Sequence, residues 1–380
     1  MRLIHTANIL LDRSYAGIPL PSTVANTCRA RRREVLENII QRAASWPADA
    51  VLIAGNLFEH DRVTPETLTF LRQTLAGAGV PVLIAPGPRD PFAHDSPYAR
   101  MPWPDNAVVF DAPSWRSVTL DDASLTVHGF AAVSMATPPA LPPLAPSADG
   151  RRHIALAYGW SAPGDEALPP HPLGGAVGYA ALGKTAQARV IPSFPVHAAA
   201  SPEPTGFEDE GAGAYLEIEW TDDEVIVTPV ECGRTSFLRW AIDTATTPAW
   251  ADLEQALLAR TEADAETVLE VVLTGPMPVA WQEGLSEARE TLRERVLHLR
   301  WLDDTEPAED WEARAAEDSV AGDFFREINQ ALADAEGPQA AQLRRARAHG
   351  WGAIEGTPLP PRLPVANPPG DEDPSGDDEA

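Results

Sequence analysis

Polar side chains follow several apolar runs of the sequence, at points where buried strands would end. Asn8 follows the first run and Asn56 follows the second. Asparagine, histidine and carboxylate side chains gathered at such strand ends can bind divalent metals and contact phosphate. The turn after the third run instead carries Pro88 and Arg89. Proline cannot bind a metal and arginine is cationic, so these loops do not contain an ordinary metal-binding set.

The elements expected to position these loops alternate between strand and helix. Apolar runs at 2–5, 49–55 and 80–87 predict buried parallel strands, and segments 27–45 and 64–79 predict the helices between them. Right-handed crossovers of this kind bring the carboxyl ends of parallel strands to one edge of a sheet. We therefore expect the polar loops to lie together.

Further strand patterns fill the chain up to residue 235. The last two, at 213–220 and 224–230, are separated by a short polar turn and predict a hairpin. Together with the first segments they predict an α/β fold, a two-sheet α/β sandwich. The other expected strands are 107–110, 115–120, 124–129, 153–158 and 178–183.

The pattern restarts after residue 235. Residues 236–305 alternate strand and helix and predict a small α/β cap domain. Residues 306–350 are expected to hold a connector, acidic over 303–318, and C-terminal helices at 319–334 and 338–349. The Pro-rich acidic tail, 351–380, is expected to be disordered.

Composition limits the classes of function. The net charge of −27 argues against a protein that binds nucleic acid by electrostatics alone, and the one dense basic run is RARRR at 29–33. That run is equally typical of a solvated helix face and of a DNA contact. No apolar stretch predicts a signal peptide or a membrane span, so a cytoplasmic protein with no membrane partner is expected.

Five loops carry a family resemblance. Their order, spacing and neighbours resemble the calcineurin-like metallophosphoesterases, most closely the SbcD-type DNA repair exonuclease subunits and their YhaO-like relatives. The resemblance covers most of residues 1–235 and, more loosely, the cap domain. The loops read HTANILLD (5–12), AGNLFEHDRVTPET (54–67), APGPRDPF (85–92), LAYG (156–159) and LGKTAQARV (182–190).

The resemblance implies a site for two Mn²⁺ or Mg²⁺ ions held by Asp, Asn and His residues of these loops. The scaffold of each motif is present here, but the ligand positions have changed. This predicts a pseudoenzyme with no catalytic residues and no metal cofactor. The vestigial positions are Asn8, Leu10, Asn56, Pro88, Arg89, Tyr158, Lys184 and Ala186.

Two of these positions suggest a different use for the pocket. Arg89 and Lys184, the only lysine in the chain, stand where the resemblance places histidines. If the two cations converge, they can bind phosphate without activating water. The alternative, that Lys184 points into solvent, stays open. His5 is expected to be a structural hydrogen-bonding residue.

An apolar stripe on the 319–334 helix predicts a docking surface. In the family that the chain resembles, helices behind the cap domain bind the coiled-coil base of an SMC-like ATPase. The alternative is that the stripe packs on the chain's own cap domain. The stripe consists of Val320, Phe324, Phe325, Ile328 and Leu332.

Three functions therefore compete. The first is a catalytically inactive SbcD-like subunit that serves as partner of an SMC-like coiled-coil ATPase in DNA repair or defence, with DNA reached through the complex. The second is an active metal-dependent exonuclease or phosphodiesterase with an atypical site. The third is a metal-free sensor of nucleic acid or phosphate. A homodimer is compatible with each of them.

Overall fold

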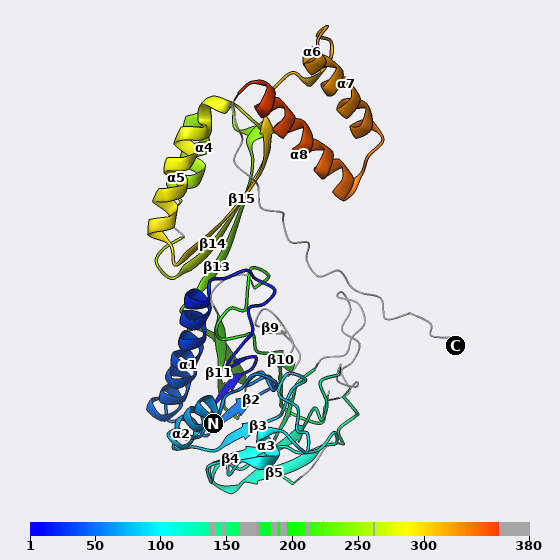
Figure 1. Cartoon of the computed structure of the whole chain (residues 1–380). Coiled ribbons are helices and arrows are strands. Elements are labelled where there is room, and N and C mark those ends of the chain that lie inside the picture. Colours follow the sequence, from blue (N-terminus) through cyan, green and yellow to red (C-terminus); the bar gives the residue numbers. More distant parts are fainter. Residues whose placement is uncertain are drawn as a thin grey trace, which may run out of the picture. The chain divides into compact units, whose positions relative to one another are not determined.

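The computed structural model of the chain contains two compact units, Met1–Phe237 and Leu238–Ala380 (Figure 1). Each unit is described by itself. The residues that the structure describes are 1–136, 141–145, 149–159, 173, 175–183, 189–190, 196–209, 213–222, 224–260 and 263–356.

The first sheet of the first unit has six strands in the order β12-β11-β1-β2-β3-β4. Strands β1 to β4 are parallel to one another, and β11 lies antiparallel to both β1 and β12. The strand bounds are β1 Arg2–Thr6, β2 Ala50–Ile53, β3 Val82–Ile84, β4 Ala107–Val109, β11 Ala214–Trp220 and β12 Val225–Glu231.

The second sheet has the order β5-β6-β7-β8-β10-β9. Its four central strands are parallel, and both edge strands run antiparallel to their neighbours. The strand bounds are β5 Arg116–Leu120, β6 Leu125–Phe130, β7 Arg152–Ala157, β8 Tyr179–Leu182, β9 Arg189–Val190 and β10 Val196–Ala198.

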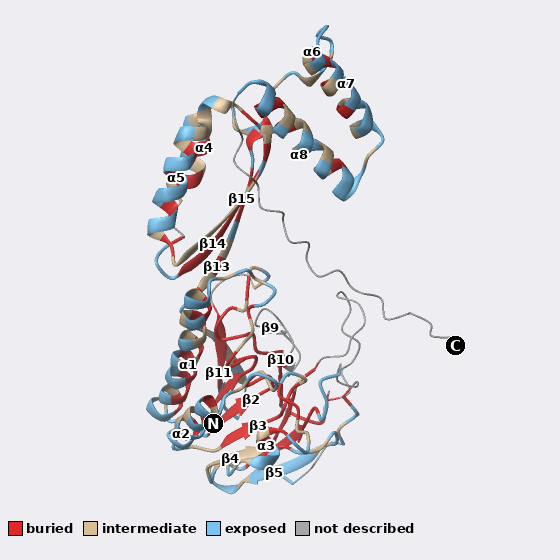
Figure 2. Ribbon diagram, viewed as in Figure 1, coloured by how far each residue is buried: buried red, intermediate tan, exposed pale blue. Residues whose placement is uncertain are grey.

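The alternation of side chains along each strand creates two cores in this unit. Ile4 of β1 faces helices α1 (Ser22–Ser45) and α2 (Pro65–Ala76), where it belongs to the same core as Leu36 of α1. Leu3, its neighbour, packs with Ile154 of β7 in the core between the two sheets. Figure 2 shows these strands as the buried part of the unit. The unit is a layered α/β sandwich, completed by the short helix α3 (Pro97–Arg100).

The second unit begins with a three-stranded sheet in the order β13-β14-β15. Helices α4 and α5 pack on this sheet. Leu253 of α4 and Leu292 of α5 form one core with Leu269 of β14. The bounds of these elements are β13 Ser236–Asp243, α4 Trp250–Leu258, β14 Thr267–Met277, α5 Gln282–Arg295 and β15 His298–Pro307.

Three further helices follow: α6 (Trp311–Ala315), α7 (Val320–Ala333) and α8 (Gly337–Ile354). Helix α7 packs against both α6 and α8, and α8 contacts β15. Ion pairs support this arrangement, since Arg347 of α8 binds Glu306 of β15 at 2.6 Å.

The mixed α/β class that the sequence predicts is confirmed, but two predictions in the second unit are wrong. The acidic segment 303–318 is not an open connector, because β15 continues to Pro307 and α6 follows. The last helix does not end before Gly350 but continues to Ile354. A Cβ at position 350 would collide with Phe324, so this glycine allows α7 and α8 to approach closely and does not end the helix. Most of the predicted disordered tail, 357–380, lies outside the described residues.

Candidate functional site

The loops after β1, β2, β3, β7 and β8 meet in the first unit. Gly55, at the end of β2, has no space for a side chain, because a Cβ there would lie 2.7 Å from Tyr158 Cβ and 3.0 Å from Gly87 Cα. Gly183, after β8, is closer still, because a Cβ there would lie 2.0 Å from the carbonyl oxygen of Ala54. Four loops from the two sheets are therefore in direct contact around Gly55.

Asn56 lies at the centre of this meeting point. Its Nδ2 donates to Asn8 Oδ1 at 2.8 Å, and its Oδ1 accepts the backbone N–H of Arg89 at 3.0 Å. A hydrogen bond also links its side chain to the hydroxyl of Tyr158, whose pKa is raised by burial. Gly87 leaves room for this side chain, since a Cβ there would collide with Asn56 Oδ1. Side chains of three loops thus bind one another directly.

The first loop adopts an unusual backbone conformation. Asn8, Leu10, Asp12 and Asn56 have φ values of 54°, 52°, 57° and 58°. This left-handed region is tolerated by Asn and Asp and is unfavourable for leucine, by roughly 1–2 kcal/mol. Backbone bonds hold the strained loop: Leu10 N–H donates to Asn56 O at 2.9 Å. Such strain is typical of functional sites.

Asp90 holds the second and third loops in place and is not available to a ligand. Its carboxylate is fully buried and accepts three backbone N–H groups, those of Asn56 at 2.8 Å, Leu57 at 2.6 Å and Gly87 at 2.7 Å. The hydroxyl of Tyr98 donates to it at 2.8 Å. Burial raises the pKa of Asp90 to about 7, while these hydrogen bonds act to lower it. Its role is to position the second and third loops.

Arg89 points outward, with 58% of its side chain exposed. Its guanidinium forms an ion pair with Glu59 at 3.7 Å, and Arg13 pairs with the same carboxylate at 3.7 Å. Its predicted partner in a phosphate pocket, Lys184, lies outside the described residues, as does Ala186. The other vestigial positions are placed: Leu10 is buried and Pro88 is half-buried.

The donor set of this site does not fit two divalent metal ions. Such ions need several anionic or imidazole donors, and the side chains that meet here are two amides and a phenol. Across the described parts of the chain, no three His, Cys, Asp or Glu side chains form a group that could hold a metal. Asp12 and Glu59, carboxylates of the first and second loops, form ion pairs with arginines.

His5 lies beneath the first loop and is fully buried. Its Nδ1 bonds to Tyr179 Oη at 2.9 Å and its Nε2 bonds to the carbonyl of Leu182 at 3.1 Å. These bonds define a neutral tautomer in which Nε2 carries the proton and Nδ1 accepts. Burial, and then the neighbouring His197, lower the pKa of His5 to about 3. It connects the two sheets as a neutral residue.

This neutral histidine makes stability depend on pH. The unfolded chain protonates His5 near pH 6.5 and the folded chain only near pH 3, so acid favours unfolding across that window. We expect His5→Gln to lack this term: between pH 6.5 and 4.5 wild type should lose roughly 2–3 kcal/mol more than the variant. Urea titrations at both pH values measure the difference. Because His197 and Tyr179 are retained in both proteins, a difference in pH dependence can be attributed to His5. Equal pH dependence of wild type and variant would contradict a neutral, buried His5.

Sequence patterns did not predict a row of four hydrogen-bonded side chains on the second sheet. Ser117 Oγ lies 2.8 Å from His128 Nδ1, His128 Nε2 lies 3.0 Å from His153 Nδ1, and His153 Nε2 lies 2.9 Å from Asp149 Oδ1. The pairing of β5 with β6 and of β6 with β7 aligns these residues, which no spacing along the chain reveals. Burial lowers the pKa of His128. The row of hydrogen bonds connects strands β5, β6 and β7.

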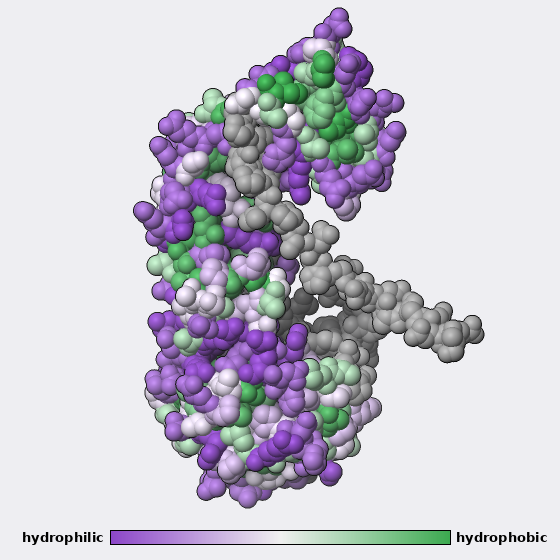
Figure 3. Space-filling view, in the orientation of Figure 1, coloured by the Kyte–Doolittle hydropathy of each residue, from purple (hydrophilic) through white to green (hydrophobic). Residues whose placement is uncertain are grey.

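The apolar stripe of α7 is mainly internal, which corrects part of the docking prediction. Phe325 is 1% exposed, with its ring centroid 5.6 Å from that of Trp311 in α6, and Ile328 is also buried. These residues turn inward because the expected connector folds into α6. Phe324 and Leu332 are half-buried, whereas Val320 is 87% exposed. Apolar side chains are visible over these helices in Figure 3.

Two kinds of comparison were made with known proteins. Neither the models of known protein families nor the curated protein sequences give a match to this chain. The family resemblance therefore remains an interpretation of the sequence motifs. Within the described residues, no helix combines the length and the apolar character needed to cross a bilayer.

Proposed function

We propose that the protein is a catalytically inactive relative of the calcineurin-like metallophosphoesterases, of the SbcD type. A two-sheet sandwich with polar loops at the ends of β1, β2, β3, β7 and β8 supports this proposal, together with the motifs in those loops. The observation that carries it is Asn56, which stands where the family has a bridging carboxylate and binds Asn8 directly.

Loss of catalysis follows from the side chains at the positions where the family has metal ligands. Amide oxygens are neutral and weak ligands, and those of Asn8 and Asn56 already accept hydrogen bonds. In a metal-dependent phosphodiesterase the metal lowers the pKa of its bound water to about 7, which creates the nucleophile. Among the residues that the structure describes, none replaces the family's metal ligands, so we expect the site to produce no hydroxide at neutral pH.

The role we propose is that of a structural subunit which acts with an SMC-like coiled-coil ATPase in DNA repair or defence. The net charge of −27 disfavours DNA binding by the isolated protein, so DNA is reached through the complex. The C-terminal helices are the proposed docking element, now centred on Val320, which is exposed at the start of α7.

Affinity capture from the native host tests this role. We expect the tagged wild-type protein to retain a protein with a P-loop ATPase motif and a long coiled coil. Val320→Asp should reduce its recovery at least tenfold, because a charge replaces an apolar contact. Ile226→Asp, at an exposed apolar residue of the first unit, is the matched control.

Two outcomes would contradict parts of the proposal. If no such ATPase is recovered with the wild-type protein, the partner role is wrong. If Val320→Asp and Ile226→Asp recover the ATPase equally well, the partner is right but the docking element is elsewhere.

A further inference from the structure

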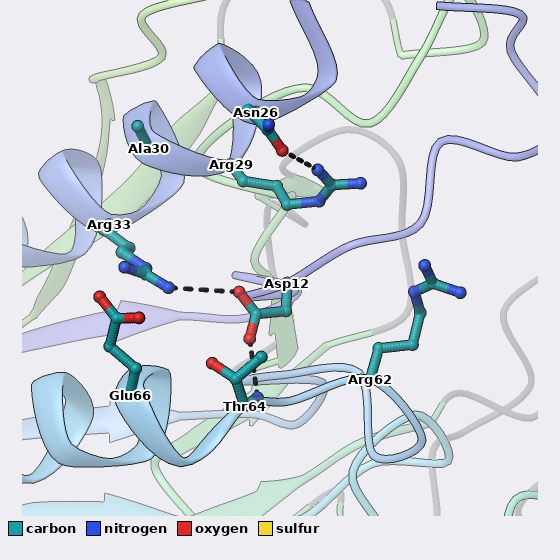
Figure 4. A pocket seen from close by; sticks show the side chains of 8 residues that line it. All are labelled: Asp12, Asn26, Arg29, Ala30, Arg33, Arg62, Thr64 and Glu66. Atoms are coloured by element: carbon teal, nitrogen blue, oxygen red, sulfur yellow. Dashed lines mark hydrogen bonds and ion pairs between the residues drawn. The ribbon is translucent and has the colours of Figure 1, made fainter. Parts of the chain in front are cut away.

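A separate pocket lies beside the first loop, between α1 and the start of α2. Its volume is about 460 Å³, which is in the range of sites for small ligands. Three arginines line it, and two carboxylates share the lining (Figure 4). The lining residues are Asp12, Asn26, Arg29, Ala30, Arg33, Arg62, Thr64 and Glu66.

One of the three arginines is neutralised by the pocket itself. Arg33 lies 3.5 Å from Asp12 Oδ1 and donates to Thr67 Oγ1 at 2.5 Å. The other oxygen of Asp12 accepts the backbone N–H of Thr64 at 3.0 Å. Asp12 therefore has both oxygens occupied, and its charge is opposed by Arg33.

The other two arginines have no such partner. Among the residues that the structure describes, neither Arg29 nor Arg62 forms an ion pair. Figure 4 shows their guanidinium groups reaching into the same space, Arg29 from α1 and Arg62 from the loop before α2. Two arginines that line one pocket and form no ion pair there attract an anion.

Arg29 is also held in place before any ligand arrives. Its Nε donates to the carbonyl of Arg13 at 3.0 Å, and its Nη1 donates to Asn26 Oδ1 at 2.6 Å. These bonds hold the guanidinium in one position and leave Nη2 free of either partner, so less side-chain entropy is lost on binding. The pocket also lies at the N-terminus of α2, whose dipole favours negative charge.

We propose that this pocket binds the phosphate group of a small phosphorylated molecule, with Arg29 and Arg62 as its direct ligands. Guanidinium groups match the geometry of phosphate oxygens, and two of them can bind one phosphate together. A small ligand is favoured over a nucleic acid, because a polyanion would meet the repulsion of the −27 net charge over a larger surface. This site is independent of the function proposed above.

Calorimetric titration of the full chain with inorganic phosphate and with a nucleoside monophosphate tests the proposal. We expect saturable binding that weakens with added salt. Arg29→Ala and Arg62→Ala should each weaken it about tenfold or more, since each removes a charged hydrogen bond. Arg72→Ala, on the exposed face of α2 outside the pocket, should bind as wild type does.

The remaining outcomes decide against the proposal. If neither phosphate nor the nucleotide binds, or if Arg72→Ala weakens binding as much as Arg29→Ala does, the pocket is not the site. If a DNA duplex binds more tightly than the monophosphate and depends on Arg29 and Arg62, the ligand is a nucleic acid and not a small molecule.

Discussion

Asp90→Ala should lower the free energy of unfolding of the first unit by about 3–6 kcal/mol, because it leaves three buried N–H groups and the Tyr98 hydroxyl without an acceptor. The N–H groups belong to Asn56, Leu57 and Gly87, in two different loops. Since a native domain is stable by only about 5–15 kcal/mol, this one substitution can unfold a large part of the population. Urea denaturation followed by circular dichroism measures the change.

Two further variants show that the effect belongs to the buried acceptor. Asp90→Asn keeps the shape of the side chain but places an NH₂ group against backbone donors, so we expect it to be destabilised as well. Asp95→Ala removes an exposed aspartate from the same loop and should change stability by less than about 0.5 kcal/mol. If Asp90→Ala unfolds at the same urea concentration as Asp95→Ala, the supporting role of Asp90 is wrong.

Local signals in the sequence predicted many elements of the first unit, but not β9, β10 or α3. The helix predicted at 64–79 is α2, which begins after a threonine cap followed by proline: Thr64 accepts the N–H of Thr67 at 3.2 Å. The apolar runs that predicted β1, β2 and β3 are buried as expected, because strands covered on both faces need apolar side chains at every position.

The contacts within the site could not be predicted in the same way. Asn56 binds Asn8 and Arg89, whose loops follow neighbouring strands of one sheet, and also Tyr158, which comes near only when the second sheet packs on the first. The sequence showed that the motif positions had changed, and it could not show that the replacements bind one another. The hydrogen-bonded row of side chains from Ser117 to Asp149 could not be predicted for the same reason, because it depends on strand pairing.

Short helices were the other source of error. Helix α6 has five residues, too few for an apolar period to be visible, and its acidic neighbours made the segment look like a connector. Its Trp311 nevertheless covers Phe325, and Arg314 pairs with Glu309 at 3.1 Å. A tertiary contact and ion pairs between close neighbours order a segment whose composition suggests a solvated linker.

Metal content tests most directly whether the meeting loops form a hydrogen-bonded site without a metal. The protein is equilibrated with excess Mn²⁺ and freed of unbound ion, and its manganese is measured by mass spectrometry. The same sample is incubated with single- and double-stranded DNA and with a chromogenic phosphodiester. We predict far less than one equivalent of manganese and no cleavage, because the amides of Asn8 and Asn56 bind each other and cannot replace anionic ligands. One or two equivalents of manganese, with cleavage that Asn56→Ala abolishes, would contradict it.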